Sequence, residues 1–526
     1  MSAKLRVAGI TLFLLVLGGM ILLVAQPGLD PARLRPLALV GGAWIAFGCA
    51  AWLLRKVTLK LAVGLILVGA IALQVVALCG PPRNSSDSYR YIWDGRVQAA
   101  GIDPYLYAPA DAGVARLRDG FLWSGTGPGH YVDCVTGSHV SQADPADSVV
   151  AGCTKLNRPT VPTIYPPVAE AYFFAVQLAA PADDSTIPIQ AAAAAFAMIV
   201  TVILLFGLRR LGKDPRLAAL WAWCPTVILE TGQNAHVDVV AVAFTLVALL
   251  LLARAKTEGR TVLGGVLLGL AIATKVTPVL VAPAVLRRGW LLISASAAAA
   301  ISLVYAPHVL AVGRKIIGFL PGYLNQEGYS SGNGFSVIGL FVHGKLTTAV
   351  AVVILAAIAI AIVRFGDPDQ PWRGGVLMTS AALAICTPNY QWYAILLVML
   401  VALDGRPEWL AIAAGGYLTN NAHLYIAGFF IRDTRLAGYG TGAAIACVCA
   451  LVRYALTRRA AARPDAIGTD AIGTEAAGHV AAAVDVPVIE PTAVYAKPAV
   501  AVTIGADGAP AFLSEDEARR ALMTHR

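Results

Sequence analysis

Acidic, basic and aromatic side chains alternate over residues 87–107, directly after an apolar run. The segment reads DSYRYIWDGRVQAAGIDPYLY. On a helix, Asp87, Arg90, Tyr91 and Asp94 would share one face, because they stand three, four and seven positions apart. A carboxylate in such a cluster can act as a general base, and an arginine can bind an anion. An aromatic belt with solvated ion pairs at a membrane surface would have the same composition, so composition alone leaves both interpretations open.

Other polar residues interrupt apolar runs further along the chain. The sequence NAHVD at residues 234–238 separates two apolar segments, and Lys275 lies within a third. An ionisable residue inside apolar sequence indicates function, so His236, Asp238 and Lys275 are candidates for binding phosphate or sugar hydroxyls. The alternatives are a hydrogen-bonded turn for His236 and Asp238, and for Lys275 a side chain that reaches the lipid headgroups.

The amino-acid composition indicates which class of protein carries these residues. Of the 526 residues, 58% are hydrophobic and 13% are charged, against about a quarter charged in soluble domains. The apolar runs are about 15 to 22 residues long, enough to cross a bilayer as helices. They are continuous rather than alternating, which excludes a transmembrane β-barrel. We therefore predict an all-α polytopic integral membrane protein with about 13 or 14 transmembrane helices.

The basic residues indicate a topology. Most of the 40 lysines and arginines stand in short clusters beside apolar runs, as the positive-inside rule requires, and the net charge of +9 therefore needs no nucleic-acid partner. With these clusters in the cytoplasm, both termini are cytoplasmic and residues 81–164 and 311–345 form external loops. The prediction is a multi-pass cell-membrane protein whose first loop carries short interfacial helices and whose active site faces outward.

Two features concern organisation. From residue 457 to 526 the sequence is rich in Ala, Pro, Thr and acidic residues and contains a tandem DAIGT, which predicts a disordered cytoplasmic tail after a membrane domain at 1–456. The eight cysteines include no CxxC and no zinc-binding spacing. Cys134 and Cys153 share the oxidising external loop, where they can either form a disulfide or remain reduced.

The motif YRYxWDGRVQAxGxxPYxYAP after an apolar run resembles the first external loop of GT-C superfamily glycosyltransferases, which use polyprenyl-phosphate sugars, and in particular family 87, which includes bacterial mannosyltransferases. The similarity continues through Tyr165-Pro166-Pro167, NAHVD at 234–238 and ATKVTP at 273–278. It covers roughly residues 84–286 and weakens towards about residue 455. Each short motif is nonspecific alone, but their order and topological side together are specific.

The resemblance implies a GT-C-like bundle that moves a sugar, mannose foremost, from a polyprenyl phosphate to a glycolipid or cell-envelope glycan at the outer face, with inversion. Asp87 matches the general base. Asp94 is the alternative base, an acceptor-binding residue, or a salt-bridge partner of Arg90 or Arg96. The expected donor phosphate or sugar ligands are Lys275, His236, Asp238, Arg90 and Arg96. The expected acceptor or sugar contacts are Tyr91, Trp93, Tyr165, Asn389, Tyr390 and Trp392, with the loop at 326–333 as a further candidate.

Other functions remain open at this stage. Asp367-Pro-Asp369 has the DxD pattern of nucleotide-sugar transferases but reads as a short turn, and no phosphate-binding glycine motif occurs in the sequence. We therefore expect neither a nucleotide nor a divalent metal; the expected partners are membrane lipids, the lipid-linked sugar and the acceptor. The alternative function is a transporter or flippase of a lipid-linked sugar, and an arabinose donor remains compatible with the resemblance.

Overall fold

The computed structural model describes most of the membrane domain and little of the carboxyl-terminal segment. The chain divides into two compact units, residues 1–458 and 459–526. In the second unit the structure describes the end of one helix and a hairpin of β7 (Val502–Ile504) with β8 (Pro510–Phe512). The predicted disordered tail therefore lies largely outside the described residues. These are 2–26, 34–83, 85–127, 131–133, 139–140, 151–181, 184–420, 424–426, 429–431, 433–461, 502–504 and 510–512.

Long apolar helices dominate the first unit. Among the described residues, seven helical segments are long and apolar enough to cross a membrane. One of them is α12 together with a 3-10 turn (Gly313–Ile317) and the short helix α13. The elements are α1 (Ala3–Ala25), α2 (Leu34–Leu54), α3 (Leu59–Leu78), α6 (Ile187–Arg210), α12 (Trp290–Val312), α13 (Leu320–Gln326), α14 (Lys345–Phe365) and α18 (Thr434–Ala461).

Shorter and broken helices complete the bundle, and the prediction of about 13 or 14 spans includes them. They are α7 (Ala219–Ala222), α8 (Pro225–Val227), the π-helix η3 (Ile228–Gln233), α9 (Asp238–Leu252), α10 (Glu258–Ile272), α11 (Ala282–Val285), α15 (Pro371–Cys386), α16 (Ile395–Asp404) and α17 (Leu410–Gly415), with 3-10 turns at Pro215–Ala218, Thr277–Val281, Gln391–Ala394, Pro407–Trp409 and Gly416–Asn420. The predicted all-α polytopic class is confirmed.

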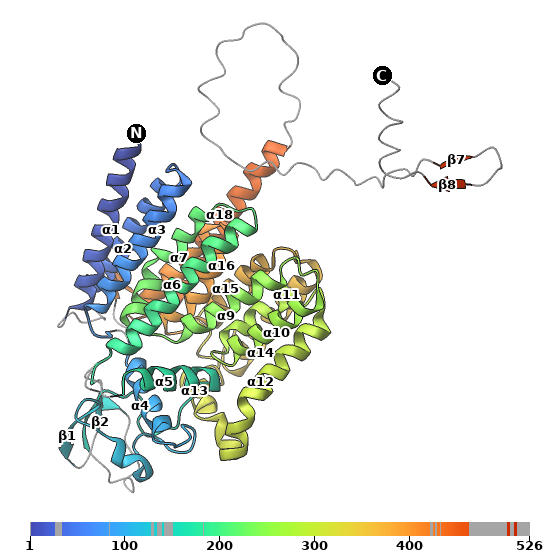
Figure 1. Ribbon diagram of the computed structural model, residues 1–526. Helices are drawn as coiled ribbons and strands as arrows, with labels where there is room; N and C mark the ends of the chain where they lie inside the picture. The colour runs from blue at the N-terminus through green and yellow to red at the C-terminus, as the bar shows by residue number, and fades with distance from the viewer. Residues whose placement is uncertain are drawn as a thin grey trace. The chain divides into compact units, whose positions relative to one another are not determined.

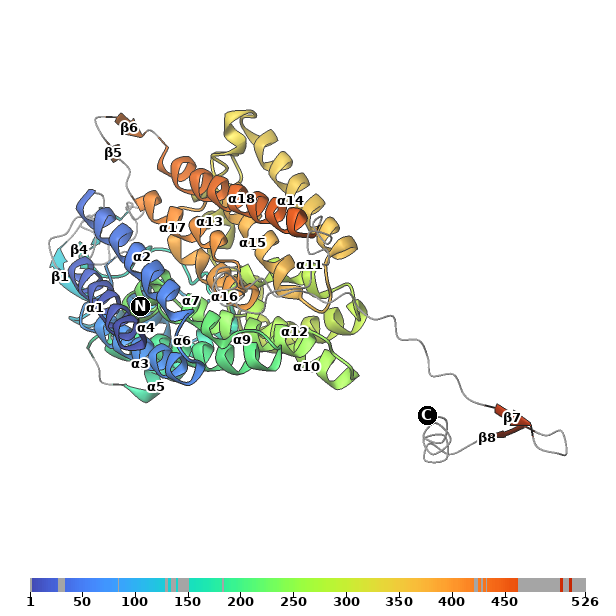
Figure 2. The ribbon, with the colours of Figure 1, turned by 90° about the horizontal axis from the view of Figure 1, so that it is seen from above.

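The helices surround a central one. Residues 395–403 of α16 are at most 3% exposed, and Figure 2 shows α16 near the middle, with α1 and α3 to one side and α14 and α18 to another. Local sequence sets several helix ends: Pro167, Pro188 and Pro371 stand in the first turns of their helices, and Gly405, with φ +82°, ends α16.

A smaller group of elements gathers at one end of the bundle, away from the amino terminus (Figure 1). It contains α4 (Asp87–Ala99), a 3-10 turn (Ala112–Leu117), α5 (Pro167–Ala179) and a sheet of order β1-β4-β2-β3. Trp123 of β1 (Trp123–Gly127) pairs antiparallel with Thr154 of β4 (Ala151–Thr154), and β2 (Tyr131–Asp133) runs parallel to β4 and antiparallel to β3 (His139–Val140). Cys153 belongs to β4, but Cys134 lies outside the described residues, and so does the predicted disulfide.

The elements of the second predicted external loop lie at the same end. Besides α13 they include a 3-10 turn at Ile338–Leu340. Arg158 of the first loop donates to Gln326 at the end of α13, 3.0 Å away. A short hairpin of β5 (Leu424–Ile426) and β6 (Phe429–Ile431) precedes α18.

The start of α1 and the end of α18 lie at the other end of the bundle (Figure 1). Arg6 donates to the carbonyl of Lys56, and Arg216 to that of Val57. Arg453 near the end of α18 pairs with Glu408 at 2.9 Å. The predicted basic clusters that contain Arg6, Lys56, Arg216 and Arg453 thus lie at this end, and α4 and α5 lie at the opposite one.

Helices α10 and α12 approach each other closely through two glycines. A Cβ on Gly265 would lie 2.8 Å from the carbonyl oxygen of Ile293, and one on Gly269 would lie 2.5 Å from that of Ala297. Small residues four apart allow membrane helices to make backbone contact. This contact fixes the end of α10, from which Lys275 projects three residues later.

The contact predicts that Gly269→Ala destabilises the protein by about 1–3 kcal/mol, because the new methyl group overpacks a backbone contact. The matched control is Gly259→Ala on the same helix, where a Cβ would meet nothing within 4 Å. Thermal unfolding of the detergent-solubilised proteins would measure both. Equal unfolding temperatures for the two variants would contradict the close contact.

Candidate active site

Helix α4 begins at Asp87 and carries the first part of the site. The backbone N–H of Asp87 donates to Ser85 Oγ at 3.1 Å, and a carboxylate in the first turn of a helix is stabilised by the helix dipole. Gly95 lets α4 lie directly on α5, since a Cβ there would be 2.7 Å from the carbonyl oxygen of Phe173. The α4–α5 pair therefore forms a rigid platform for Asp87.

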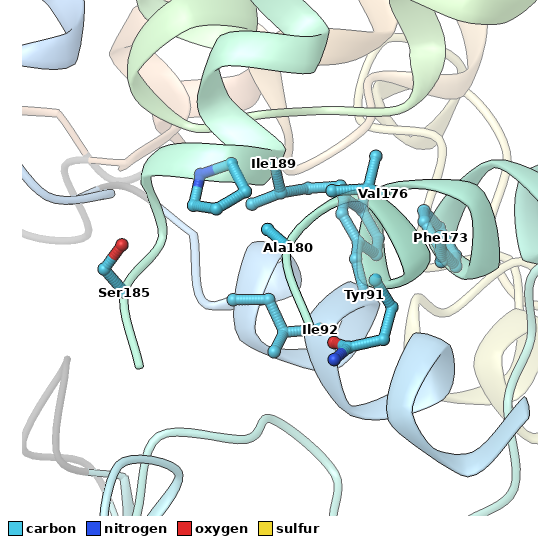
Figure 3. A pocket seen from close by; sticks show the side chains of 9 residues that line it. Tyr91, Ile92, Phe173, Val176, Ala180, Ser185 and Ile189 are labelled. Carbon is cyan, nitrogen blue, oxygen red and sulfur yellow. The ribbon is translucent and has the colours of Figure 1, made fainter. Parts of the chain in front are cut away.

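A small cavity lies beside this platform (Figure 3). Tyr91 of α4 and Phe173 of α5 line it, and their rings stack with centroids 4.2 Å apart. Its volume of about 20 Å³ is enough for one water molecule. The cavity is too small for a sugar, so the chemistry must be sought at the polar side chains near Asp87.

The Asp87 carboxylate has three polar neighbours. Asn157 donates to Oδ1, and Nδ1 of His236 lies 3.8 Å from Oδ2. Burial and the negative charge of Asp87 raise the pKa of the Tyr165 hydroxyl well above its usual value. The Asp87 side chain remains 12% exposed, so the carboxylate is both held in place and accessible.

Behind Asp87 lies a fully buried pair. His236 Nε2 is 3.4 Å from Glu230 Oε2, and both side chains are 0% exposed. Glu230 also accepts hydrogen bonds from Tyr417, at 2.9 Å, and from Asn234, at 3.1 Å. Each ring nitrogen of His236 therefore faces a carboxylate, and neither nitrogen makes a hydrogen bond among the described residues.

Lys275 and Asp238 form the cationic side of the site. Lys275 Nζ lies 3.1 Å from Asp238 Oδ2, which joins the start of α9 to the segment after α10. The ammonium also lies 5.3 Å from the ring centroid of Tyr165 and 5.7 Å from that of Tyr393, within the range of cation–π attraction. Tyr165 thus stands between Asp87 and Lys275.

Asp94, the alternative base, is bound in a salt bridge. Arg90 Nε contacts both carboxylate oxygens, at 3.0 and 3.1 Å, and the two side chains are 5% and 2% exposed. Burial raises the pKa of Asp94, against the opposing effect of Arg90. Arg90 also donates to the carbonyls of Arg158 and Val161, so the pair fixes the chain segment that carries Asn157.

Two other predicted residues on α4 have different partners. Arg96 pairs with Asp119 and Asp184. Trp93 packs against Trp123 of β1, with ring centroids 6.0 Å apart, in the core of the first loop. Neither is among the residues gathered around Asp87.

Aromatic rings extend the site towards the second loop. His236 stacks on Trp392 with centroids 4.0 Å apart, and Trp392 stacks on Tyr390 at 4.5 Å. Tyr390 and Asn389 both donate to the Glu327 carboxylate, at 3.1 and 2.7 Å. The structure therefore brings the predicted residues Asn389, Tyr390 and Trp392 into contact with the network around Asp87.

Sequence reasoning did not identify four residues of this network. Glu230 lies in an apolar run, and that position is itself a signal of function. Glu327, 7% exposed, falls in the predicted loop 326–333 but was not distinguished from its neighbours. Asn157 and Arg158 carry no sequence signal, because only tertiary contacts bring them to Asp87 and Glu327; Arg158 Nη2 lies 3.9 Å from Glu327 Oε1.

The described part of the chain was searched for side chains that could bind a metal ion together. No group of three or more His, Cys, Asp or Glu residues there is arranged to hold a metal ion. Whether the protein works without a metal remains a prediction.

The fold and this site are those of a multi-pass membrane protein that has a network of acidic, basic and aromatic side chains at one end of its helix bundle. The family model of glycosyltransferase family 87 matches residues 163–388. The match confirms the predicted resemblance and supports a membrane glycosyltransferase of the GT-C type. It includes His236, Asp238 and Lys275, and it begins after Asp87. Neither the curated proteins nor the solved structures gave a match.

The buried salt bridge predicts that Asp94→Asn destabilises the protein by about 3–5 kcal/mol, because Arg90 would keep a buried charge without its partner. The control is Asp184→Asn, whose side chain is 73% exposed and whose loss should leave stability unchanged. Unfolding curves of the solubilised variants would measure the difference. A mutant as stable as the control would show that Arg90 finds another partner.

The buried carboxyl group of Glu170 predicts that the stability of the folded protein depends on pH. Burial and the neighbouring Asp94 raise the pKa of this α5 carboxyl well above its usual value, while Thr163 and Arg90 oppose the shift. The pKa of Glu170 is thus higher in the folded protein than in the unfolded chain, where it is about 4.5. The contribution of Glu170 to folding stability is therefore complete below the unfolded pKa and is lost as the pH rises through the folded pKa.

Glu170→Gln should therefore make unfolding stability less dependent on pH above this value, with a smaller dependence left by Asp94. The amide can still bond Thr163 and Gln98, which contact the two carboxyl oxygens at 2.7 and 2.9 Å. Unfolding temperatures measured from pH 5 to 9, with Asp184→Asn as control, would test this. An unchanged pH profile would contradict it.

Proposed function

We propose that this protein transfers a sugar, mannose foremost, from a polyprenyl phosphate to a glycolipid or cell-envelope glycan, with Asp87 as general base and inversion at the sugar carbon. The observation that carries the proposal is the difference between two carboxylates on one helix face. Asp87 is partly exposed and lies beside His236, whereas Asp94 is 2% exposed and bound to Arg90. A base must reach the proton that it removes, and Asp87 meets that condition.

The chemical step follows from these positions. The acceptor oxygen attacks the anomeric carbon as the bond from that carbon to the phosphate oxygen breaks, and the acceptor proton passes to Asp87. His236 faces the second oxygen of Asp87 at 3.8 Å, and Asn157 donates a hydrogen bond to the first oxygen. The polyprenyl phosphate leaves as a monoester.

Lys275 is suited to the charge of the leaving phosphate. An ammonium group has three N–H donors, so Lys275 can keep its contact with Asp238 and still bind a phosphate oxygen. The aromatic faces of Tyr165 and Tyr393 near the ammonium restrict its motion. Protein cations thus supply the positive charge that a metal would otherwise provide.

The membrane side of the reaction is part of the proposal. The basic clusters lie at the end of the bundle opposite α4 and α5, and the positive-inside rule favours the cytoplasm for that end. The site would then face outward, where a lipid-linked sugar and an envelope acceptor can meet.

Asp87→Asn is expected to lower transfer by about 10²–10⁴-fold, the usual contribution of a general base. The assay follows radiolabelled mannose from polyprenyl-phosphate-mannose into a membrane extract, at matched amounts of folded protein. Lys275→Gln should instead raise the apparent KM for the donor. Asp184→Asn, which removes an exposed acid from the connection between α5 and α6, is the control.

Three results would count against the proposal. Full activity of Asp87→Asn would remove the base assignment, and loss only in folded Asp94→Asn would transfer the role to Asp94. Absence of transfer by the wild type, with an arabinose donor tried as well, would favour the transporter or flippase alternative.

A further inference from the structure

A large cleft lies between the second predicted external loop and the start of α18. Its volume is about 1060 Å³, at the upper end of ligand pockets, which measure about 300–1,000 Å³. Neither Asp87 nor Lys275 lines it. The cleft is therefore distinct from the cationic part of the site, and it has room for more than one sugar ring.

The residues that line the cleft offer both hydrogen-bond donors and hydrogen-bond acceptors, and sugar hydroxyls bind to both. Donors and acceptors come from Ser336, His343, Asn389, Thr419, Asp433 and Arg435. The hydroxyl oxygen of Ser336 is buried and has no hydrogen-bond partner among the described residues.

The polar residues at the cleft are fixed by contacts with the protein. Asp433 accepts hydrogen bonds from the backbone N–H groups of Arg435 and Leu436, each at 3.0 Å, and so begins α18. Arg435 Nη2 donates to the carbonyl of Asn333 at 3.1 Å, which ties α18 to the second loop. Thr419 donates to the carbonyl of Asn389 at 2.9 Å.

Asn389 connects the cleft to the catalytic network. It lines the cleft, and its amide nitrogen donates to Glu327, which also binds Tyr390. From Tyr390 the stacked rings of Trp392 and His236 lead to Asp87. A chain of direct contacts thus runs from the cleft to the proposed base.

We infer that this cleft binds the acceptor, and that the acceptor is a glycan of several sugar units whose terminal hydroxyl reaches Asp87. The inference rests on the proposed function and adds the acceptor class and its site. The mixed polar lining suits sugar hydroxyls better than a lipid chain, because an apolar chain would take these polar groups out of water without forming hydrogen bonds to them. A donor lipid would instead bind with its phosphate at Lys275.

The test blocks the cleft and measures glycan binding directly, without donor. Gly339 lines the cleft, and a Cβ there would meet nothing within 4 Å, so Gly339→Trp is chosen to place a large side chain at the cleft. Gly120→Trp is the matched control, since Gly120 is also open but does not line the cleft. The full-length proteins in nanodiscs are titrated with manno- and arabino-oligosaccharides of two to five units. Donor KM and acceptor KM are measured in parallel.

We expect Gly339→Trp to weaken oligosaccharide binding and raise the acceptor KM by about tenfold or more, which corresponds to about 1.4 kcal/mol, with donor KM unchanged. Arg435→Ala, which enlarges the cleft and removes a donor, should weaken binding in the same direction. Gly120→Trp should behave as wild type.

The inference is overturned if the wild type binds none of the oligosaccharides, or if Gly339→Trp and Arg435→Ala bind them as well as wild type does. It is also overturned if Gly339→Trp raises the donor KM by the same factor, because the cleft would then hold the donor. Oligosaccharide binding that both variants weaken, without any sugar transfer by wild type, would support the glycan site and refute the proposed reaction.

Discussion

The ion pair of Lys275 and Asp238 joins two helix ends that would otherwise leave charges in an apolar bundle. Lys275 follows α10 and Asp238 begins α9, with 3.1 Å between the charged atoms. The two side chains are only 14% and 5% exposed, and an unpaired buried ion is very costly. The pair therefore holds the start of α9 at the level of the end of α10. The glycine contact between α10 and α12 supports the same arrangement from the other side.

A second buried pair has a different role. Arg90 and Asp94 face each other on α4, and the arginine also holds the carbonyls of Arg158 and Val161. That segment in turn presents Asn157 to Asp87. One acid of the motif thus stabilises the loop, while the other stays accessible at the start of the helix. Two similar carboxylates thus have different surroundings, because their burial and partners differ.

The site is assembled from segments far apart in sequence. Asp87, His236 and Trp392 come from the first loop, the turn before α9 and the turn before α16. Direct contacts connect them to Glu327 of the second loop. The bundle holds these groups at one end, where the proposed lipid-linked donor and glycan acceptor would meet. Rigid helix ends suit the proposed reaction, since catalytic groups must be held within fractions of an ångström.

Hydrophobic runs determine helices and their approximate ends, because a bilayer-spanning segment must satisfy its backbone internally. The sequence therefore predicted the all-α class, and the motifs with His236, Asp238 and Lys275 lie in the part of the chain that matches the model of glycosyltransferase family 87. It left Asp94 with three possible roles, and it did not distinguish Trp93 and Arg96 from residues near Asp87. Glu230, Asn157, Arg158 and Glu327 emerged only from the tertiary structure. The physical reason is that helix ends set which side chains reach the same end of the bundle, whereas close packing between distant segments decides which of them touch.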